Sequence, residues 1–210
     1  CILVTGVRIA LYPMQELERR LDGADGELAS TYLDNLLLSD PDNPRLRMLM
    51  ARAQIRLNET LKVREILQPL AESPDVDQRR EALWLLWEMY LGEQRQWDKR
   101  RKEWPISRHQ EIELALADLV EEMRVAMHQI AAIESLPDRL LSLASKAHEL
   151  HENLLSAQIY RRIGEAMGVG EAATRFYEHA ARQMLAVGDY EGSASIYLLA
   201  KKSSRDYLQG

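Results

Sequence analysis

One pattern of small and aromatic residues occurs twice in this chain at the same spacing. Its members lie four and then three positions apart: Ser156, Tyr160 and Ile163 in the first copy, and Ser193, Tyr197 and Ala200 in the second. Apolar residues follow the same spacing within residues 28–41 and 61–70. Positions spaced in this way share one face of an α-helix. The chain is therefore predicted to consist of repeated helical units.

A second amphipathic segment precedes each of these helices, and each pair of helices forms one unit. The preceding segments carry adjacent apolar or small residues at their centres: Met50–Ala51, Leu83–Trp84, Leu143–Ala144 and Ala180–Ala181. The units begin near Ala10, Pro44, Asp77, Pro137 and Thr174. This spacing resembles the ~34-residue period of tetratricopeptide repeats. In that family small residues let the two helices approach, and we expect Tyr190 and Tyr197 to fill the space that they leave.

Composition also favours an all-α fold class. Of 210 residues, 46% are hydrophobic and only 10 are Gly and 7 are Pro, which favours one helical body over a sandwich or an α/β sheet. We predict an α-solenoid of tetratricopeptide-like helix hairpins with an irregular central segment. The predicted parts are a candidate end of a membrane anchor (1–13), degenerate repeats (14–91), an irregular basic segment followed by a long amphipathic helix (92–136), and two repeats (137–210).

The first 13 residues are apolar except for Thr5 and Arg8. They are shorter than the ~20 residues that a spanning helix needs. They fit either the trailing end of a membrane segment that starts before Cys1, or a buried capping helix or strand. Both ends of the sequence look cut, so we expect a longer chain.

The central segment contains the one strongly basic stretch of the chain. Residues 95–105 place Arg95, Lys99, Arg100, Arg101 and Lys102 between or beside Trp97 and Trp104. Aromatics among basic residues fit contact with nucleic acid or phospholipid, and the alternative is a solvated helix with one tryptophan in the core. After it, an apolar stripe (Ile112, Leu116, Leu119, Met123, Met127 and Ile130) predicts a long helix that packs on the solenoid or forms a seam with another subunit.

Several classes of function are not expected. A net charge of −6 argues against general nucleic-acid binding, and the single cysteine, Cys1, allows no internal disulfide and no zinc cluster. His148 and His151 are three apart and would share a helix face, but no third metal ligand accompanies them. Neither a nucleophile motif nor a phosphate loop occurs. We therefore predict no catalytic residue, metal, cofactor or small-molecule substrate.

A narrower resemblance is carried by four segments. These are "LYPMQELERRL" (11–21), "STYLDNLLLSDPDNPRLRMLMARAQIRL" (30–57), "LLSAQIYRRIGEAMG" (154–168) and "FYEHAARQMLAVGDYEGSASIYLLA" (176–200). Together they resemble the amino-terminal periplasmic repeat region of PelB-type exopolysaccharide export proteins, over roughly residues 11–70 and 137–205; residues 92–136 fit poorly.

The resemblance implies a protein–protein interaction scaffold in the periplasm, tethered to the inner membrane. Its expected partner is the deacetylase and hydrolase component of the Pel polysaccharide system. The alternative is a stand-alone cytoplasmic tetratricopeptide adaptor that binds peptide segments.

The same resemblance implies a partner-binding groove. In the tetratricopeptide family the second, fifth, ninth, twelfth and thirteenth residues of a unit face this groove. Counting in this way selects Arg45, Met48, Arg52, Ile55, Arg56, Glu81, Glu88, Leu141, His148, Glu149, Arg175, Glu178 and Arg182. Charge changes sign along these positions, which favours an extended partner with an acidic part near Arg52 and a basic part near Glu81 and Glu88. The alternative is that these charges are only solvated.

Overall fold

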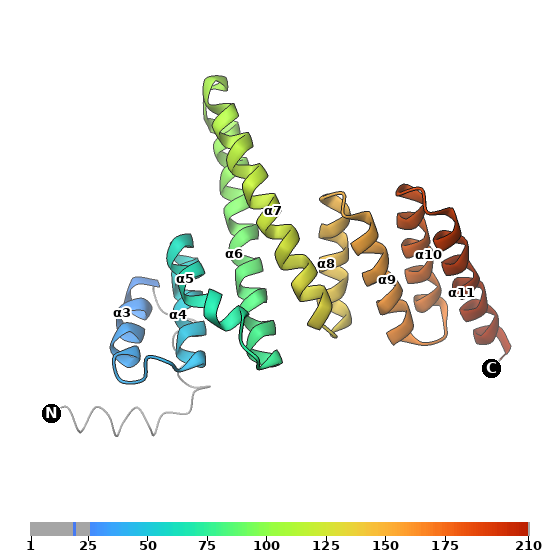
Figure 1. The fold of residues 1–210 in the computed structure, drawn as a ribbon, viewed down its shortest axis with the longest axis horizontal. Helices are drawn as coiled ribbons and strands as arrows, with labels where there is room; N and C mark the ends of the chain where they lie inside the picture. The colour runs from blue at the N-terminus through green and yellow to red at the C-terminus, as the bar shows by residue number, and fades with distance from the viewer. Residues whose placement is uncertain (1–18, 20–25, 210) are drawn as a thin grey trace. The chain divides into compact units, whose positions relative to one another are not determined.

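The computed structural model describes residue 19 and residues 26–209, and within them the chain is α-helical apart from short connections (Figure 1). The helices are α3 (Gly26–Leu37), α4 (Pro44–Arg56), α5 (Thr60–Ala71), α6 (Val76–Glu103), α7 (His109–Ile133), α8 (Pro137–Glu149), α9 (Asn153–Met167), α10 (Glu171–Ala186) and α11 (Tyr190–Gln209), with a 3₁₀ turn at Ile106–Arg108. The all-α prediction is confirmed for these residues. The candidate anchor end at 1–13 lies outside them.

The chain divides into two compact units, Cys1–Leu119 and Val120–Gly210, with the boundary inside α7. Within each unit, helices that follow one another in sequence pack against one another, which is compatible with an α-solenoid. Among the helices of the described residues, none combines the length and the apolar character needed to cross a bilayer.

The first helices of the predicted units begin close to the expected positions. α4 and α8 begin at Pro44 and Pro137, where the fixed φ of proline suits the first helical turn. The Asn43 side chain accepts hydrogen bonds from the backbone N–H groups of Arg45 and Leu46 at 3.1 and 3.2 Å. Side chains of this type satisfy N–H groups that have no partner within the helix.

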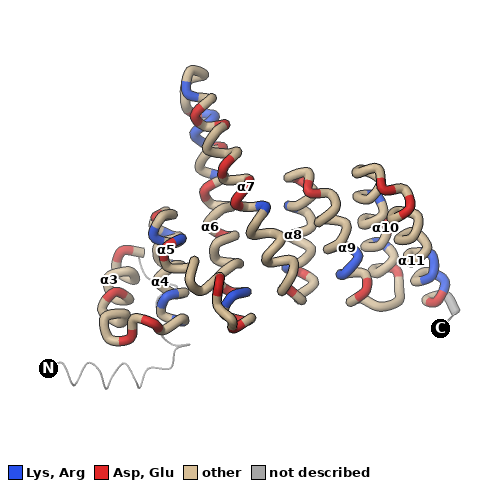
Figure 2. Tube along the Cα trace, in the orientation of Figure 1, with Lys and Arg blue, Asp and Glu red and all other residues tan. Residues whose placement is uncertain are grey.

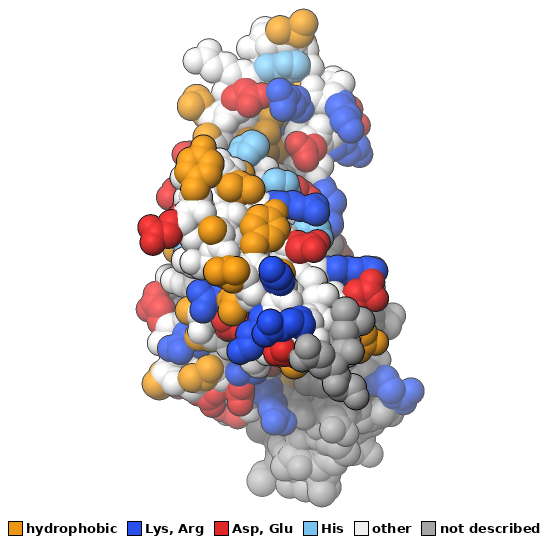
Figure 3. Space-filling model, turned by 90° about the vertical axis from the view of Figure 1, so that its right-hand side faces the viewer, with side chains coloured by type: hydrophobic (Ala, Val, Ile, Leu, Met, Phe, Trp, Pro, Cys, Tyr) orange, Lys and Arg blue, Asp and Glu red, His pale blue; other side chains and the backbone are white. Residues whose placement is uncertain are grey.

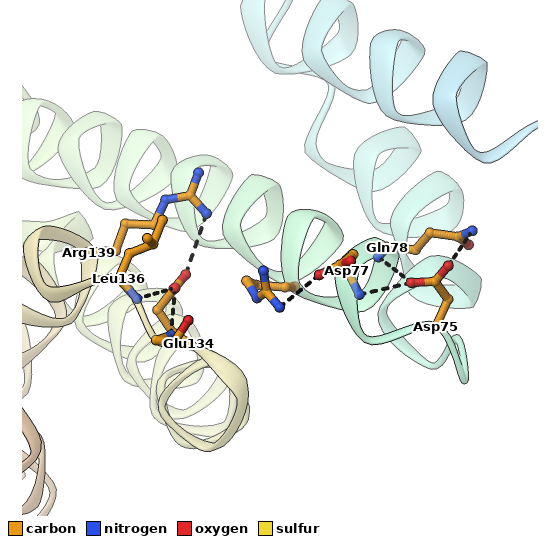
Figure 4. Close-up of polar contacts among 8 residues, drawn as sticks. Asp75, Asp77, Gln78, Glu134, Leu136 and Arg139 are labelled. Atoms are coloured by element: carbon orange, nitrogen blue, oxygen red, sulfur yellow. Dashed lines mark hydrogen bonds and ion pairs between the residues drawn. The ribbon is translucent and has the colours of Figure 1, made fainter. Parts of the chain in front are cut away.

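In the first unit, α3 and α4 form a small apolar core, Ile66 of α5 packs against it, and α6 contacts α4 and α5. The centre of this core consists of Ala29, Leu33, Leu36, Leu46, Leu49, Met50 and Ala53. Asp75 begins α6 by accepting hydrogen bonds from the N–H groups of Asp77 and Gln78 at 2.9 and 3.1 Å (Figure 4). α6 then continues for 28 residues, whereas α4 and α5 have 13 and 12.

Residues 92–136 contain the long amphipathic helix that the sequence predicted, α7, but the basic stretch before it is helical and not irregular. α6 runs through to Glu103, Pro105 follows its end, and α7 begins at His109. The repeat period is lost because α6 and α7 are longer than standard repeat helices, not because the backbone is irregular. The apolar stripe of α7 is largely buried, with Leu116 half-buried.

In the second unit, α10 and α11 enclose a core of small residues around one aromatic ring: Ala173, Tyr177, Ala180, Ala181, Ile196 and Ala200. Gly164 of α9 allows the Tyr177 ring to lie close to the α9 backbone, since a Cβ there would lie 3.0 Å from the ring. Burial raises the pKa of the hydroxyls of Tyr160 and Tyr177 above the usual value for tyrosine, so both stay neutral at physiological pH.

The pairing of small residues with aromatics is therefore present, but with different tyrosines. Tyr190 is 75% exposed and Tyr197 is 39% exposed. The expectation that these two fill space between helices was wrong, because Ile196 and Ala200, not the tyrosines, form the buried face of α11. Tyr160 is half-buried and stacks on Phe176 and His179 of α10.

Candidate partner-binding surfaces

The predicted groove positions of α4 divide between its surface and the core. Arg45 and Arg56 are exposed, and Arg52 and Ile55 are half-buried. Met48 is only 5% exposed. Its assignment to the groove is therefore corrected: α4 contacts α3, α5 and α6, so its apolar face is wider than that of a helix with one neighbour.

An ion pair joins the predicted positions of α4 and α6. A guanidinium nitrogen of Arg52 lies 2.7 Å from a carboxylate oxygen of Glu81. Both side chains are partly solvated, with 35% and 51% exposure, and Glu88 is exposed farther along α6. The first helices of two successive hairpins therefore contribute to one surface in the first unit. The sequence predicts that Arg52 and Glu81 contact different parts of a partner. In the structure these two side chains also neutralise each other.

A cavity of about 20 Å³ lies beside this surface, between α6 and the turn that joins α4 to α5. Ile55, Val63 and Met89 form its apolar lining, and Asn58 and Gln96, which share a hydrogen bond, form part of its polar lining. The volume is enough for about one water molecule. Sites for small organic ligands have roughly 300–1,000 Å³, so this cavity suits solvent.

The predicted groove residues of the second unit lie on α8 and α10. The acidic and arginine side chains among them form ion pairs with residues of the same helix. Leu141, His148, Glu149, Arg175 and Arg182 are exposed, and Glu178 is half-buried. Their ion pairs are made within single helices: Lys146–Glu149, Arg175–Glu171 and Arg182–Glu178. Exposed pairs of this kind contribute little to stability, so a partner could replace them at low cost.

The two histidines considered as metal ligands do not share a helix face. α8 ends at Glu149, and His151 follows with a φ of 61°, so the chain has already turned away from the helix. His148 Nδ1 lies 3.2 Å from the Asn153 side-chain oxygen instead. Nowhere in the described residues do three or more His, Cys, Asp or Glu side chains gather in a group that could hold a metal ion.

A second surface is formed where α6 and α7 reverse direction, at residues 97–108, which we call the basic tip. The Arg100 guanidinium lies over the rings of Trp97 and Trp104, and the Arg108 guanidinium also lies over Trp104. Both tryptophans are half-buried. The sequence interpretation with one tryptophan in a core is not what the structure has: both rings are covered by arginines.

A third surface, on α11, was missed by sequence reasoning. Tyr190, Tyr197, Leu198 and Tyr207 are exposed there, and Figure 3 shows hydrophobic side chains gathered on the face of the molecule that it presents. The exposed apolar positions of a helix could have indicated it, but the repeat pattern assigned the tyrosines to packing.

Comparisons with protein-family models, with curated proteins and with solved structures gave no match for this chain.

Proposed function

We propose that this chain is a protein–protein interaction scaffold built from tetratricopeptide-type helix hairpins. Its motifs resemble those of PelB-type proteins, so we assign it to a Pel-type exopolysaccharide export system, in the periplasm and tethered to the inner membrane. Its role there is to bind and position the deacetylase and hydrolase component. Binding is its chemistry, and the proposal gives it no catalytic step.

The observation that carries the scaffold proposal is the contact between Arg52 and Glu81. Tetratricopeptide scaffolds bind extended segments along the first helices of successive hairpins, which requires those helices to lie side by side. The helices α4 and α6 are in contact. Further predicted groove residues on them are charged and exposed: Arg45 and Arg56 on α4, and Glu88 on α6. Charged groups at a binding surface govern the specificity and rate of association more than its affinity.

A charge-swap variant tests this surface without removing the ion pair. In Arg52→Glu/Glu81→Arg each helix carries the opposite charge, but the pair can still form, so folding should be preserved. We expect the affinity for the purified deacetylase and hydrolase component to fall about tenfold or more at low salt, with a smaller difference at high salt. Binding is measured by titration calorimetry, and folding by thermal melting.

The matched control is Arg161→Glu/Glu165→Arg. This pair on α9 has a similar distance, 2.8 Å, and both side chains are exposed, but α9 is a second helix and lies outside the predicted groove. The control should bind like the unaltered chain. Equal binding by both swap variants would assign the partner to another surface. Binding of short peptides by a chain with no affinity for the export component would favour the alternative of a cytoplasmic adaptor.

A further inference from the structure

The basic tip concentrates positive charge in a chain whose net charge is −6. The tip, residues 97–108, contains five basic and two acidic residues. Lys99 lies 3.7 Å from Glu103, and Arg101 lies 2.9 Å from Glu113. The other three basic residues form no ion pair with any residue that the structure describes: Arg100, Lys102 and Arg108. The intramolecular contacts therefore leave a surplus of positive charge at this end of the hairpin (Figure 2).

Two arginines of the tip, Arg100 and Arg108, lie over tryptophan rings. Arg100 lies 4.6 Å from the centre of the Trp97 ring, and Arg108 lies 5.2 Å from that of Trp104. A guanidinium stacked in this way is oriented by the ring, while the N–H donors in its plane stay available for oxyanions. The stacking therefore prepares these groups for phosphate or carboxylate oxygens.

The end of the tip is apolar. Ile106 is 84% exposed, in the 3₁₀ turn between the helices. An exposed isoleucine at the turning point, between the basic stretch 99–102 and Arg108 in sequence, gives the hairpin an amphipathic end. Cations in the last turn of α6 also complement the helix dipole, but the dipole gives no reason for an exposed isoleucine beyond the helix.

The arrangement of the charges selects the direction of approach. Lys99, Arg100, Arg101 and Lys102 are consecutive, and successive residues of an α-helix are rotated by about 100°, so these side chains surround the helix axis. A ligand lying along one side of α6 would reach about half of them. A flat surface that meets the hairpin end-on can reach them all. The side-chain contacts from α5 and from the turn before it reach α6 at Glu93 and Gln96, before the tip begins.

We propose that the basic tip docks end-on against a bilayer that contains anionic phospholipids. The basic side chains contact the lipid phosphates, and Ile106 enters the headgroup region. Basic and aromatic residues beside an exposed apolar side chain are typical of interfacial binding. Single-stranded nucleic acid fits less well, because stacked bases need open aromatic faces, whereas Trp97 and Trp104 are half-buried and each has an arginine over its ring. An acidic peptide fits less well, because peptide recognition uses grooves or sheet edges. This inference does not depend on the proposed scaffold function.

Vesicle co-sedimentation of the whole chain tests the proposal. Vesicles of phosphatidylcholine alone are compared with vesicles containing roughly one third phosphatidylglycerol, at low and high salt. We expect binding to the anionic vesicles only, weakened by salt. Each basic residue near such a surface changes binding about fivefold, so Lys99→Glu/Lys102→Glu should lower the partition coefficient at least about twentyfold. The single variant Lys102→Gln, at an exposed position with no ion pair among the described residues, should lower it about fivefold.

The matched control is Lys201→Glu/Lys202→Glu, which makes the same change of charge at two exposed lysines of α11. It should bind like the unaltered chain. The apolar residues 1–13 are common to all these proteins, so differences among them report on the tip. Ile106→Ser should weaken binding several-fold without changing its salt dependence.

Three results would overturn the proposal. The first is equal binding to neutral and anionic vesicles. The second is an equal loss of binding in the tip variant and the α11 control. The third is a single-stranded DNA or an acidic peptide that binds in a tip-dependent manner while anionic vesicles do not bind.

Discussion

Gly188 lies in the turn between α10 and α11 and has a φ of 79°, a backbone conformation that residues with a side chain rarely adopt. No atom lies within 4 Å of the position that a Cβ would take. The strain of a substitution there would come from the backbone alone. Gly92 lies within α6, where a Cβ would meet only the end of the Arg95 side chain at 3.9 Å. The same change of residue should therefore have opposite effects at the two positions.

We expect Gly188→Ala to destabilise the chain by about 1–2 kcal/mol, because alanine is strained in the left-handed region. Gly92→Ala should instead stabilise it by up to about 1 kcal/mol, because alanine favours the helix. Urea unfolding of the two variants measures both effects. A stabilised Gly188→Ala variant would contradict the turn seen between α10 and α11.

At the scale of elements, the connection from α7 to α8 is fixed by a buried carboxylate. Glu134 is 0% exposed, and its Oε1 accepts hydrogen bonds from the N–H groups of Ser135 and Leu136 at 2.8 and 2.9 Å (Figure 4). Arg162 of α9 donates hydrogen bonds to the carbonyl oxygens of Ala131 and Glu134. Three helices thus meet at one polar connection, which orients α8 at its start.

The backbone contacts of Glu134 should matter more than its ion pair with Arg139. Arg139 lies 3.4 Å from the carboxylate and its side chain is 48% exposed, so Arg139→Ala should cost about 1–2 kcal/mol, chiefly because the buried carboxylate loses its cation. Glu134→Ala leaves two N–H groups without their acceptor and should cost about 2–3 kcal/mol. Denaturant titration compares the two variants, and equal losses would show that the ion pair dominates.

At the scale of the whole molecule, we expect the free energy of unfolding to come mainly from contacts between neighbouring helices. In the second unit α9 packs on α8 and α10, and α10 packs on α9 and α11. In stacked helical structures such contacts contribute to stability as terms between nearest neighbours. A local change should then weaken its own unit while leaving the other unit protected.

Ala200→Leu tests this division. Ala200 is 4% exposed in the core between α10 and α11, and the larger side chain should cost about 1–3 kcal/mol by overpacking. Hydrogen exchange should become faster in α10 and α11, with unchanged protection in α4, α5 and α6. Equally faster exchange in both units would mean that the chain unfolds as one cooperative body.

The sequence by itself indicated several of the points where helices begin or end. Proline at positions 44, 105 and 137 and glycine at position 188 restrict or permit particular backbone angles through atoms close to them in the chain, so their effects can be predicted locally. The spacing of apolar residues likewise indicated the buried face of α7, because helical periodicity needs no knowledge of the partner.

Tertiary structure decided which faces were covered and which charges met. Met48 is buried because α4 has three neighbours, and Tyr190 is exposed because it lies outside the α11 face that α10 covers. Arg52 and Glu81 are 29 positions apart, and their contact depends on the packing of α4 against α6. The stacking of Arg108 on Trp104 depends on how the turn after α6 folds back. Sequence periodicity defines the faces of one helix, whereas burial and charge pairing depend on how many helices pack against it and from which sides.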